Sequence, residues 1–235
     1  MEERKSVALK KEEFAVKEYV KTSLGKGKAS KVEIEYTPVG EKIIVSTHKP
    51  GLVIGRKGER IGELTEFLKK EFKLANPHVE IKEITEPELD AQLMADEIAL
   101  GLERVGPLKF KVIAYRALET IMKAGALGAE LKLSGKLPST RAKTWRFAQG
   151  YLKKAGESAK LVDRAQAVAM TKPGVVGIKV AILSPYVKLT DKVVIDEAMI
   201  NKLKENMKLK DVSLKPKKKK STRKKATKKV EEAKK

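Results

Sequence analysis

A nine-residue segment, VIGRKGERI at residues 53–61, constrains this chain more than any other part of its sequence. Two glycines, Gly55 and Gly58, enclose Arg56 and Lys57, and an amphipathic helical pattern begins directly after the second glycine. Glycine has no side chain to hold a ligand away from the backbone, and the first amides of a helix are unpaired donors at the positive end of its dipole. The segment therefore predicts a loop that binds phosphate groups, with both cations within reach of the same ligand.

The residues around this loop exclude two other phosphate-binding motifs. A Walker loop needs Gly-Lys followed by Ser or Thr, whereas Lys57 is followed by Gly58, and the dinucleotide fingerprint Gly-x-Gly-x-x-Gly is absent. The remaining alternative is a plain strand-to-helix turn that carries two cations. The apolar residues Val53, Ile54 and Ile61 favour the phosphate-binding interpretation, because in the KH fold a GXXG loop grips the RNA backbone while apolar neighbours form a groove for the bases.

The charge of the chain also favours a polyanionic partner. The 235 residues include 52 Lys or Arg and 31 Asp or Glu, a net charge of +21, and nucleic acid is the usual partner of so basic a protein. Hydrophobic residues make up 41% of the chain, which suffices for a buried core. There is no cysteine, and His48 and His78 are the only histidines. We therefore expect no disulfide, no structural metal and no cofactor.

The sequence contains no candidate membrane segment. No apolar run approaches the ~20 residues of a membrane span, and the charged first residues are followed by no signal-peptide core. We expect a cytoplasmic protein that has neither a membrane partner nor a small-molecule substrate.

Hydrophobic periodicity predicts a first domain at residues 12–85. It begins with a helix at 12–24, and an alternating segment, with Val32, Ile34 and Tyr36 apolar, then forms a hairpin with the apolar run at 43–45. The glycine loop follows with its helix at 61–72, and a third strand occupies 79–84. This order of elements matches a type II KH domain.

Residues 86–190 are predicted to form a second α+β domain. Thr85 and Glu88 have the spacing of a capping box that opens a helix, and a Gly-Pro pair at 106–107 ends that helix and starts another. Alternating segments follow as far as Ile182, with Trp145, Phe147 and Tyr151 expected on one face of a strand at 143–152. The predicted fold class is therefore α+β, a type II KH domain followed by a second α+β domain and a basic tail.

The C-terminal residues differ in composition from the rest of the chain. Apolar residues at helical spacing predict a helix at 191–209. Residues 210–235 contain 13 Lys or Arg and three acidic residues, so they hold +10 of the net charge with almost no apolar content. We expect this tail to be disordered when free, and to serve as a solubilising tail, a localisation signal or an RNA-binding extension.

Several separate stretches resemble the small-subunit ribosomal protein S-three family, in its archaeal form. They occur in the family's order and together cover roughly residues 5–185. The stretches are KPGLVIGRKG at 49–58, EPELDA at 86–91, SGKL at 134–137 with RAK at 141–143, and GVVGIKV at 174–180.

The resemblance implies a structural protein of the small ribosomal subunit, in the cytoplasm. Its implied partners are small-subunit ribosomal RNA, neighbouring proteins of the subunit head and messenger RNA. The basic residues that border the path by which messenger RNA enters lie, in the bacterial pattern, on the helix matching residues 106–124. Lys111 keeps a cation there, whereas Val112 and Tyr115 replace basic residues. We assign Lys109, Lys111 and Arg116 to this path.

The predicted RNA-binding residues form two groups. The first is the clamp, Gly55, Arg56, Lys57 and Gly58, with Arg60 as a nearby phosphate contact. The second is a basic patch whose alternative interpretation is an exposed hairpin face without a ligand. Its members are Lys136, Arg141, Lys143 and Arg146. Trp145 and Phe147 are expected in the core rather than as platforms for bases.

Two other functions compete with a ribosomal role. A DNA lyase would need a lysine whose pKa is lowered by burial or by a cationic neighbour, and every lysine lies in a pattern typical of exposed residues. No catalytic triad or metal cluster can be assembled from the spacing, so we do not expect an enzyme. The other alternative is a free KH factor in transcription or RNA decay, which the motifs beyond residue 86 disfavour.

Overall fold

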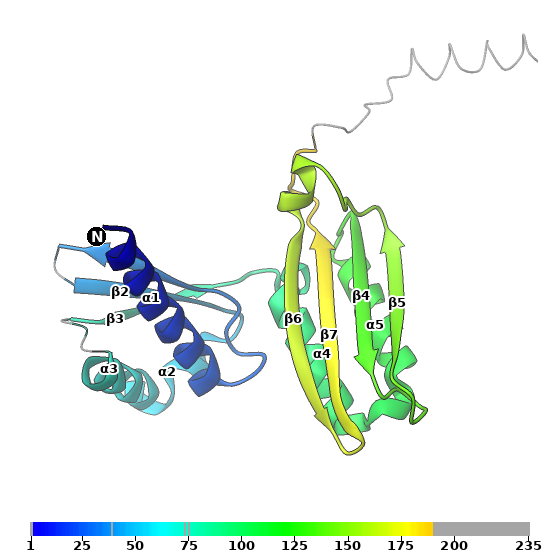
Figure 1. Ribbon diagram of the computed structural model, residues 1–235, viewed down its shortest axis with the longest axis horizontal. Coiled ribbons are helices and arrows are strands. Elements are labelled where there is room, and N and C mark those ends of the chain that lie inside the picture. Colours follow the sequence, from blue (N-terminus) through cyan, green and yellow to red (C-terminus); the bar gives the residue numbers. More distant parts are fainter. Residues whose placement is uncertain (1, 39, 73, 75, 190–235) are drawn as a thin grey trace, which may run out of the picture. The chain divides into compact units, whose positions relative to one another are not determined.

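The computed structural model describes residues 2–38, 40–72, 74 and 76–189. The helix predicted at 191–209 and the tail predicted at 210–235 lie outside these residues. The described chain contains a three-stranded and a four-stranded sheet, each with its own hydrophobic core (Figure 1). The predicted α+β fold class is confirmed for this part of the protein.

The first sheet has the order β1-β2-β3, in which β1 and β2 form an antiparallel hairpin and β3 is parallel to β2. A parallel neighbour requires a crossover connection, and the short helices around the glycine loop supply it. The elements are α1 (Glu2–Leu24), β1 (Val32–Thr37), β2 (Gly40–Thr47), α2 (Pro50–Ile54), α3 (Glu59–Glu71) and β3 (His78–Glu83).

The core of this part explains the pattern seen in the sequence. Ile43 and Val45 alternate along β2 and are fully buried, and they pack with Leu64 and Leu68, which lie four residues apart on α3. Helix α1 begins ten residues earlier than the sequence predicts. Its added turns are rich in charged residues that favour helix but leave Val7 and Leu9 exposed, so no apolar periodicity marks them.

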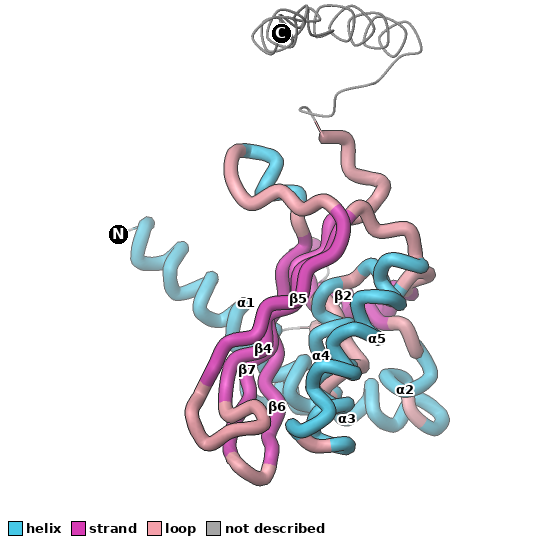
Figure 2. Tube along the Cα trace, turned by 90° about the vertical axis from the view of Figure 1, so that its right-hand side faces the viewer, coloured by secondary structure: helices cyan, strands magenta, loops and turns pink. Residues whose placement is uncertain are grey.

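The second sheet is fully antiparallel, with the order β5-β4-β7-β6. Helices α4 and α5 cover one of its faces and leave the other face open (Figures 1 and 2). The elements are α4 (Ala91–Val105), α5 (Phe110–Lys123), β4 (Gly128–Gly135), β5 (Lys143–Gly150), β6 (Asp163–Thr171) and β7 (Gly174–Leu183).

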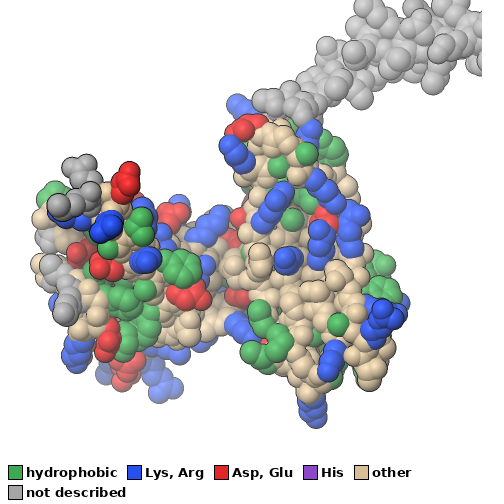
Figure 3. Space-filling model, in the orientation of Figure 1, with side chains coloured by type: hydrophobic (Ala, Val, Ile, Leu, Met, Phe, Trp, Pro, Cys, Tyr) green, Lys and Arg blue, Asp and Glu red, His purple; other side chains and the backbone are tan. Residues whose placement is uncertain are grey.

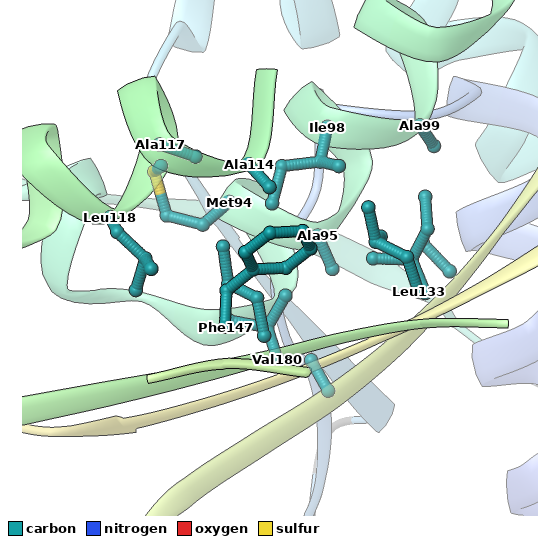
Figure 4. Close-up of a cluster of buried hydrophobic side chains, with 14 of the residues drawn as sticks. Met94, Ala95, Ile98, Ala99, Ala114, Ala117, Leu118, Leu133, Phe147 and Val180 are labelled. Carbon is teal, nitrogen blue, oxygen red and sulfur yellow. The ribbon is translucent and has the colours of Figure 1, made fainter. Parts of the chain in front are cut away.

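Alternation along the strands separates a buried face from an exposed face. Leu133, Phe147 and Val180 point from the sheet towards the helices, where they meet side chains such as Met94 and Leu118 (Figure 4). Residues one position away in each strand must point to the open face. The core therefore determines which charged side chains share the exposed surface of the sheet.

The structure corrects two predictions about this part. The N-cap of α4 is Asp90, whose Oδ1 accepts hydrogen bonds from the amides of Gln92 and Leu93, and the predicted box at Thr85 does not form. Pro87 instead begins a short 3₁₀ turn that places Asp90, a strong N-cap residue, at the start of the helix. Tyr151 does not share the face of Trp145 and Phe147. It follows the end of β5 and is 53% exposed.

Candidate nucleic-acid interface

The glycine loop has an unusual backbone conformation. Gly55 ends α2 with φ 74° and ψ −173°, and Gly58 precedes α3 with φ 82°. Between them, Lys57 adopts φ 52° and is the one non-glycine residue with positive φ in the described chain. Positive φ at three of these four residues turns the chain sharply from α2 into α3.

The two glycines are needed for different reasons. A Cβ atom at Gly55 would lie 3.0 Å from the Cβ atom of Arg60, so this position combines positive φ with close packing. A Cβ atom at Gly58 would meet nothing within 4 Å. Gly58 is thus required by its backbone angle alone, because L-residues rarely adopt it.

The loop presents both of its cations to solvent. Arg56 and Lys57 are exposed, and no side chain of the described residues caps the first turn of α3. Among the first amides of α3, that of Glu59 is paired with the carbonyl oxygen of Arg56, while the positive end of the helix still favours an anion nearby. Arg60 has a second task, since its Nη1 donates a hydrogen bond to the carbonyl oxygen of Leu52 at 3.0 Å and joins α3 to α2.

A hollow of about 580 Å³ lies beside the loop, and its lining contains equal numbers of basic and acidic side chains. It is lined by Arg56 and Arg60 but also by Glu59 and Glu63. A phosphate deep in this hollow would face two carboxylates. The geometry therefore favours an anion at the tip of the loop, where Lys57 adds a cation that does not line the hollow.

The second predicted patch is divided by the fold. Lys136 and Arg141 lie in the connection between β4 and β5, and Lys143 begins β5. Arg146 is three residues further along the same strand, an odd spacing that places it on the opposite face from Lys143. The structure thus brings Lys136, Arg141 and Lys143 towards one end of the sheet and assigns Arg146 to the open face.

On the open face Arg146 joins a charge cluster that the sequence interpretation missed. Its Nε lies 2.7 Å from Glu130 Oε1, Lys132 Nζ lies 3.3 Å from the same oxygen, and Lys154 Nζ lies 2.8 Å from Oε2. The Glu130 side chain is only 6% exposed. Burial alone would raise its pKa, but the hydrogen bonds from Lys154, Arg146 and Lys132 outweigh burial and lower the pKa to about 2.

The residues assigned to the messenger RNA path lie just before α5 and in its first half. Lys109 ends a 3₁₀ turn that leads into the helix, and Lys111 and Arg116 are exposed on the helix itself. Lys111 Nζ lies 4.9 Å from the centroid of the Trp145 ring, a cation–π contact. Trp145 is half-buried and packs against the core beside Phe110, so its ring supports the Lys111 cation.

Lysine burial and metal-ligand clusters bear on the enzyme alternative. None of the lysines among them is buried, and they contain no group of three or more His, Cys, Asp or Glu that could hold a metal ion. None of the helices described is long and apolar enough to cross a membrane.

Comparison with known protein families agrees with this architecture. Residues 15–89 match the KH domain family, and residues 98–182 match the family described as ribosomal protein S3, C-terminal domain. Together the two matches define a ribosomal-type protein with an N-terminal KH domain, which is the class that the motifs predicted.

Similar proteins identify the family. The chain is 44% identical to small ribosomal subunit protein uS3 of Methanocaldococcus jannaschii, over 84% of this chain and 94% of that protein. It is 39% identical to the protein of that name from Methanococcus maripaludis strain C5, over 87% of this chain and 97% of the other. The chain belongs to the family of small ribosomal subunit protein uS3, and the predicted resemblance to its archaeal members is confirmed.

Proposed function

We propose that this protein is a structural constituent of the small ribosomal subunit that binds ribosomal RNA in the subunit head. The observation that carries the proposal is the match of both parts of the chain, in order, to one ribosomal family. Its site of action is the ribosome in the cytoplasm. Its partners are small-subunit ribosomal RNA, neighbouring head proteins and messenger RNA, and it performs no chemistry of its own.

The clamp formed by Gly55, Arg56, Lys57 and Gly58 is the first proposed RNA contact. Its support is the backbone geometry, since positive φ at Gly55, Lys57 and Gly58 accompanies two exposed cations at the N-terminal end of α3. An RNA phosphate at this point would receive hydrogen bonds from the helix and charge from the loop. Arg60 supports the loop through Leu52 and adds positive charge nearby.

The second proposed contacts lie in the C-terminal part. Lys136, Arg141 and Lys143 form a basic patch at one end of the sheet, and Arg146 contributes to the open face. Lys109, Lys111 and Arg116 border the path by which messenger RNA enters. The exposed positions of these last three and the support of Lys111 by Trp145 favour this role.

The competing functions have less support. A free KH factor in transcription or RNA decay does not account for the match of residues 98–182 to a ribosomal family. A DNA lyase would require a lysine whose pKa is lowered by burial or by a cationic neighbour. The lysines among the described residues are exposed or half-buried, which disfavours the first route.

One measurement tests the ribosomal proposal directly. In a lysate gradient the native protein should cosediment with the small subunit and should leave that fraction only when the subunit is dissociated. Recovery chiefly in the soluble fraction, with intact subunits elsewhere in the gradient, would contradict the proposal and favour a free RNA-binding factor.

A second measurement tests the role of α5. Replacing Lys109, Lys111 and Arg116 by Gln should preserve assembly of the protein into subunits, because the three side chains are exposed. Translation of a structured message should slow relative to an unstructured one. Lost assembly without this selective defect would instead identify the three residues as ribosomal RNA anchors.

A further inference from the structure

The open face of the second sheet carries three cations side by side across three strands. Lys132 on β4 is paired in register with Arg146 on β5 and with Lys179 on β7. Neighbouring strands are about 4.8 Å apart, and like charges placed directly opposite each other destabilise a sheet. A row of this kind is therefore unfavourable for folding unless an anion compensates it.

The next row of the sheet provides one anion and open space. Glu130 is paired with Ala148 on one side and Ala181 on the other, and Arg164 of β6 stands opposite Ala181. A hollow of about 400 Å³ opens beside Ala181, and its lining includes Glu130, Lys132, Lys154, Arg164 and Lys179. In Figure 3, Lys and Arg side chains gather on this part of the sheet around an acidic side chain.

The single carboxylate positions cations but does not neutralise the site. Glu130 holds Arg146, Lys132 and Lys154 at hydrogen-bonding distance, and their side chains remain about half exposed. In the described part of the chain Arg164 and Lys179 form no ion pair. Three of the five cations are thus held in place by one buried carboxylate before a ligand arrives, which reduces the entropy that they lose on binding.

We propose that this hollow, lined by Lys132, Lys154, Arg164 and Lys179 over Glu130, binds a phosphate group of an RNA backbone. Guanidinium and ammonium groups on one surface suit phosphate oxygens. A protein partner fits less well, because protein–protein interfaces are depleted in Lys whereas nucleic-acid interfaces are strongly positive. The inference rests on the proposed RNA-binding function and adds to it a contact surface that is separate from the clamp and from α5.

Binding of the full-length protein to a fluorescein-labelled single-stranded RNA of about 20 nucleotides tests the inference by fluorescence anisotropy across a salt series. The variant Arg164→Gln/Lys179→Gln removes two cations that do not contact Glu130, so the cluster remains intact. Affinity should fall about tenfold at ~0.1 M salt. The slope of log affinity against log salt should fall by roughly 0.7 for each phosphate that the variant no longer neutralises.

A matched control removes the same charge elsewhere. Lys5→Gln/Lys11→Gln changes two exposed residues of α1 and should leave both affinity and slope unchanged. Thermal melting of both variants establishes that they are folded. Equal losses in the two variants would mean that only overall charge matters, and unchanged binding in the Arg164/Lys179 variant would mean that the hollow takes no phosphate. Either result overturns the inference.

Two further binding experiments complete the test. One asks whether the hollow on the sheet binds an acidic peptide instead of RNA, and the other measures RNA binding at the clamp. If the Arg164/Lys179 variant loses affinity for a labelled poly-glutamate peptide but not for RNA, the hollow binds an acidic protein segment and the inference is wrong. Arg56→Asp/Lys57→Asp in the same RNA assay reports on the clamp alone. Loss only in the clamp variant supports the proposed function and rejects the sheet site, whereas loss only in the sheet variant supports the sheet site and rejects the clamp.

Discussion

The glycine loop and the open face of the second sheet both present cations to solvent, but they do so by different physical means. At the loop, backbone angles accessible to glycine expose Arg56 and Lys57 within four consecutive residues. On the sheet, a buried carboxylate holds cations from different segments, with Arg146 and Lys132 on paired strands. The first arrangement is local in sequence and the second is tertiary. They should therefore respond differently to mutation.

The largest effect on stability is expected at Glu130. The depressed pKa corresponds to about 3 kcal/mol of stabilisation at neutral pH. The half-exposed cations regain water when the carboxylate is removed, so Glu130→Gln should destabilise the protein by about 2 kcal/mol. Urea unfolding at pH 7 measures this. A loss below ~0.5 kcal/mol would mean that the Glu130 ion pairs do not stabilise the folded sheet. The proposed difference between this cluster and the glycine loop would then be wrong.

The same substitution should have a characteristic pH dependence. The pKa of Glu130 is lower in the folded protein than its ordinary value of 4.5, so its stabilisation is complete above pH 4.5 and is lost as the pH falls towards 2. The difference in stability between wild type and Glu130→Gln should shrink by roughly a third to a half between pH 7 and pH ~3.5. A difference that grows on acidification would contradict the assigned ion pairs.

The loop should respond in binding rather than in stability. Arg56→Asp/Lys57→Asp turns two phosphate contacts into repulsion and should weaken RNA binding roughly 10- to 100-fold. The unfolding free energy should change by less than ~0.5 kcal/mol, because both residues are exposed and form no packed contact. Isolating the two effects requires anisotropy and thermal melting on the same preparation. Normal RNA affinity in a folded variant would remove the clamp from the proposed function.

The smallest effects on stability are expected at two glycines of the loop region that differ in backbone angle but not in packing. Gly58 and Gly62 both have open space where a Cβ atom would lie, but only Gly58 has positive φ. Gly58→Ala should destabilise the protein by about 1 kcal/mol. Gly62→Ala, in the interior of α3, should stabilise it by up to about 1 kcal/mol. Changes of the same sign in a pair of thermal melts would show that backbone angle does not govern the loop.

Sequence reasoning succeeded where the physical cause is local. The apolar run Ile43, Ile44 and Val45 predicted β2, and helical spacing of Leu64 and Leu68 predicted α3, because burial selects apolar residues in those short segments directly. It failed at the start of α4, where a box at Thr85 and a cap at Asp90 are both compatible with the sequence. Pro87 and the turn that it begins decide between them only in the folded chain.

The basic patch, whose members lie on different faces of the sheet, shows how far the sequence could predict the site. Period-two alternation could have separated Lys143 from Arg146 within one strand, and that signal was present in the sequence. Nothing local, however, places Lys179 beside Lys132, since 47 positions separate them and only the pairing of β4 with β7 brings them together.

The sequence by itself determined the α+β class, the position of the glycine loop directly before a helix and the excess of positive charge, because side-chain period, glycine spacing and composition act within a few residues or over the whole chain. Only the tertiary structure decided which cations share a surface. Strand order and register set those neighbours, and the burial of Glu130 among them follows from how the sheet closes over its core.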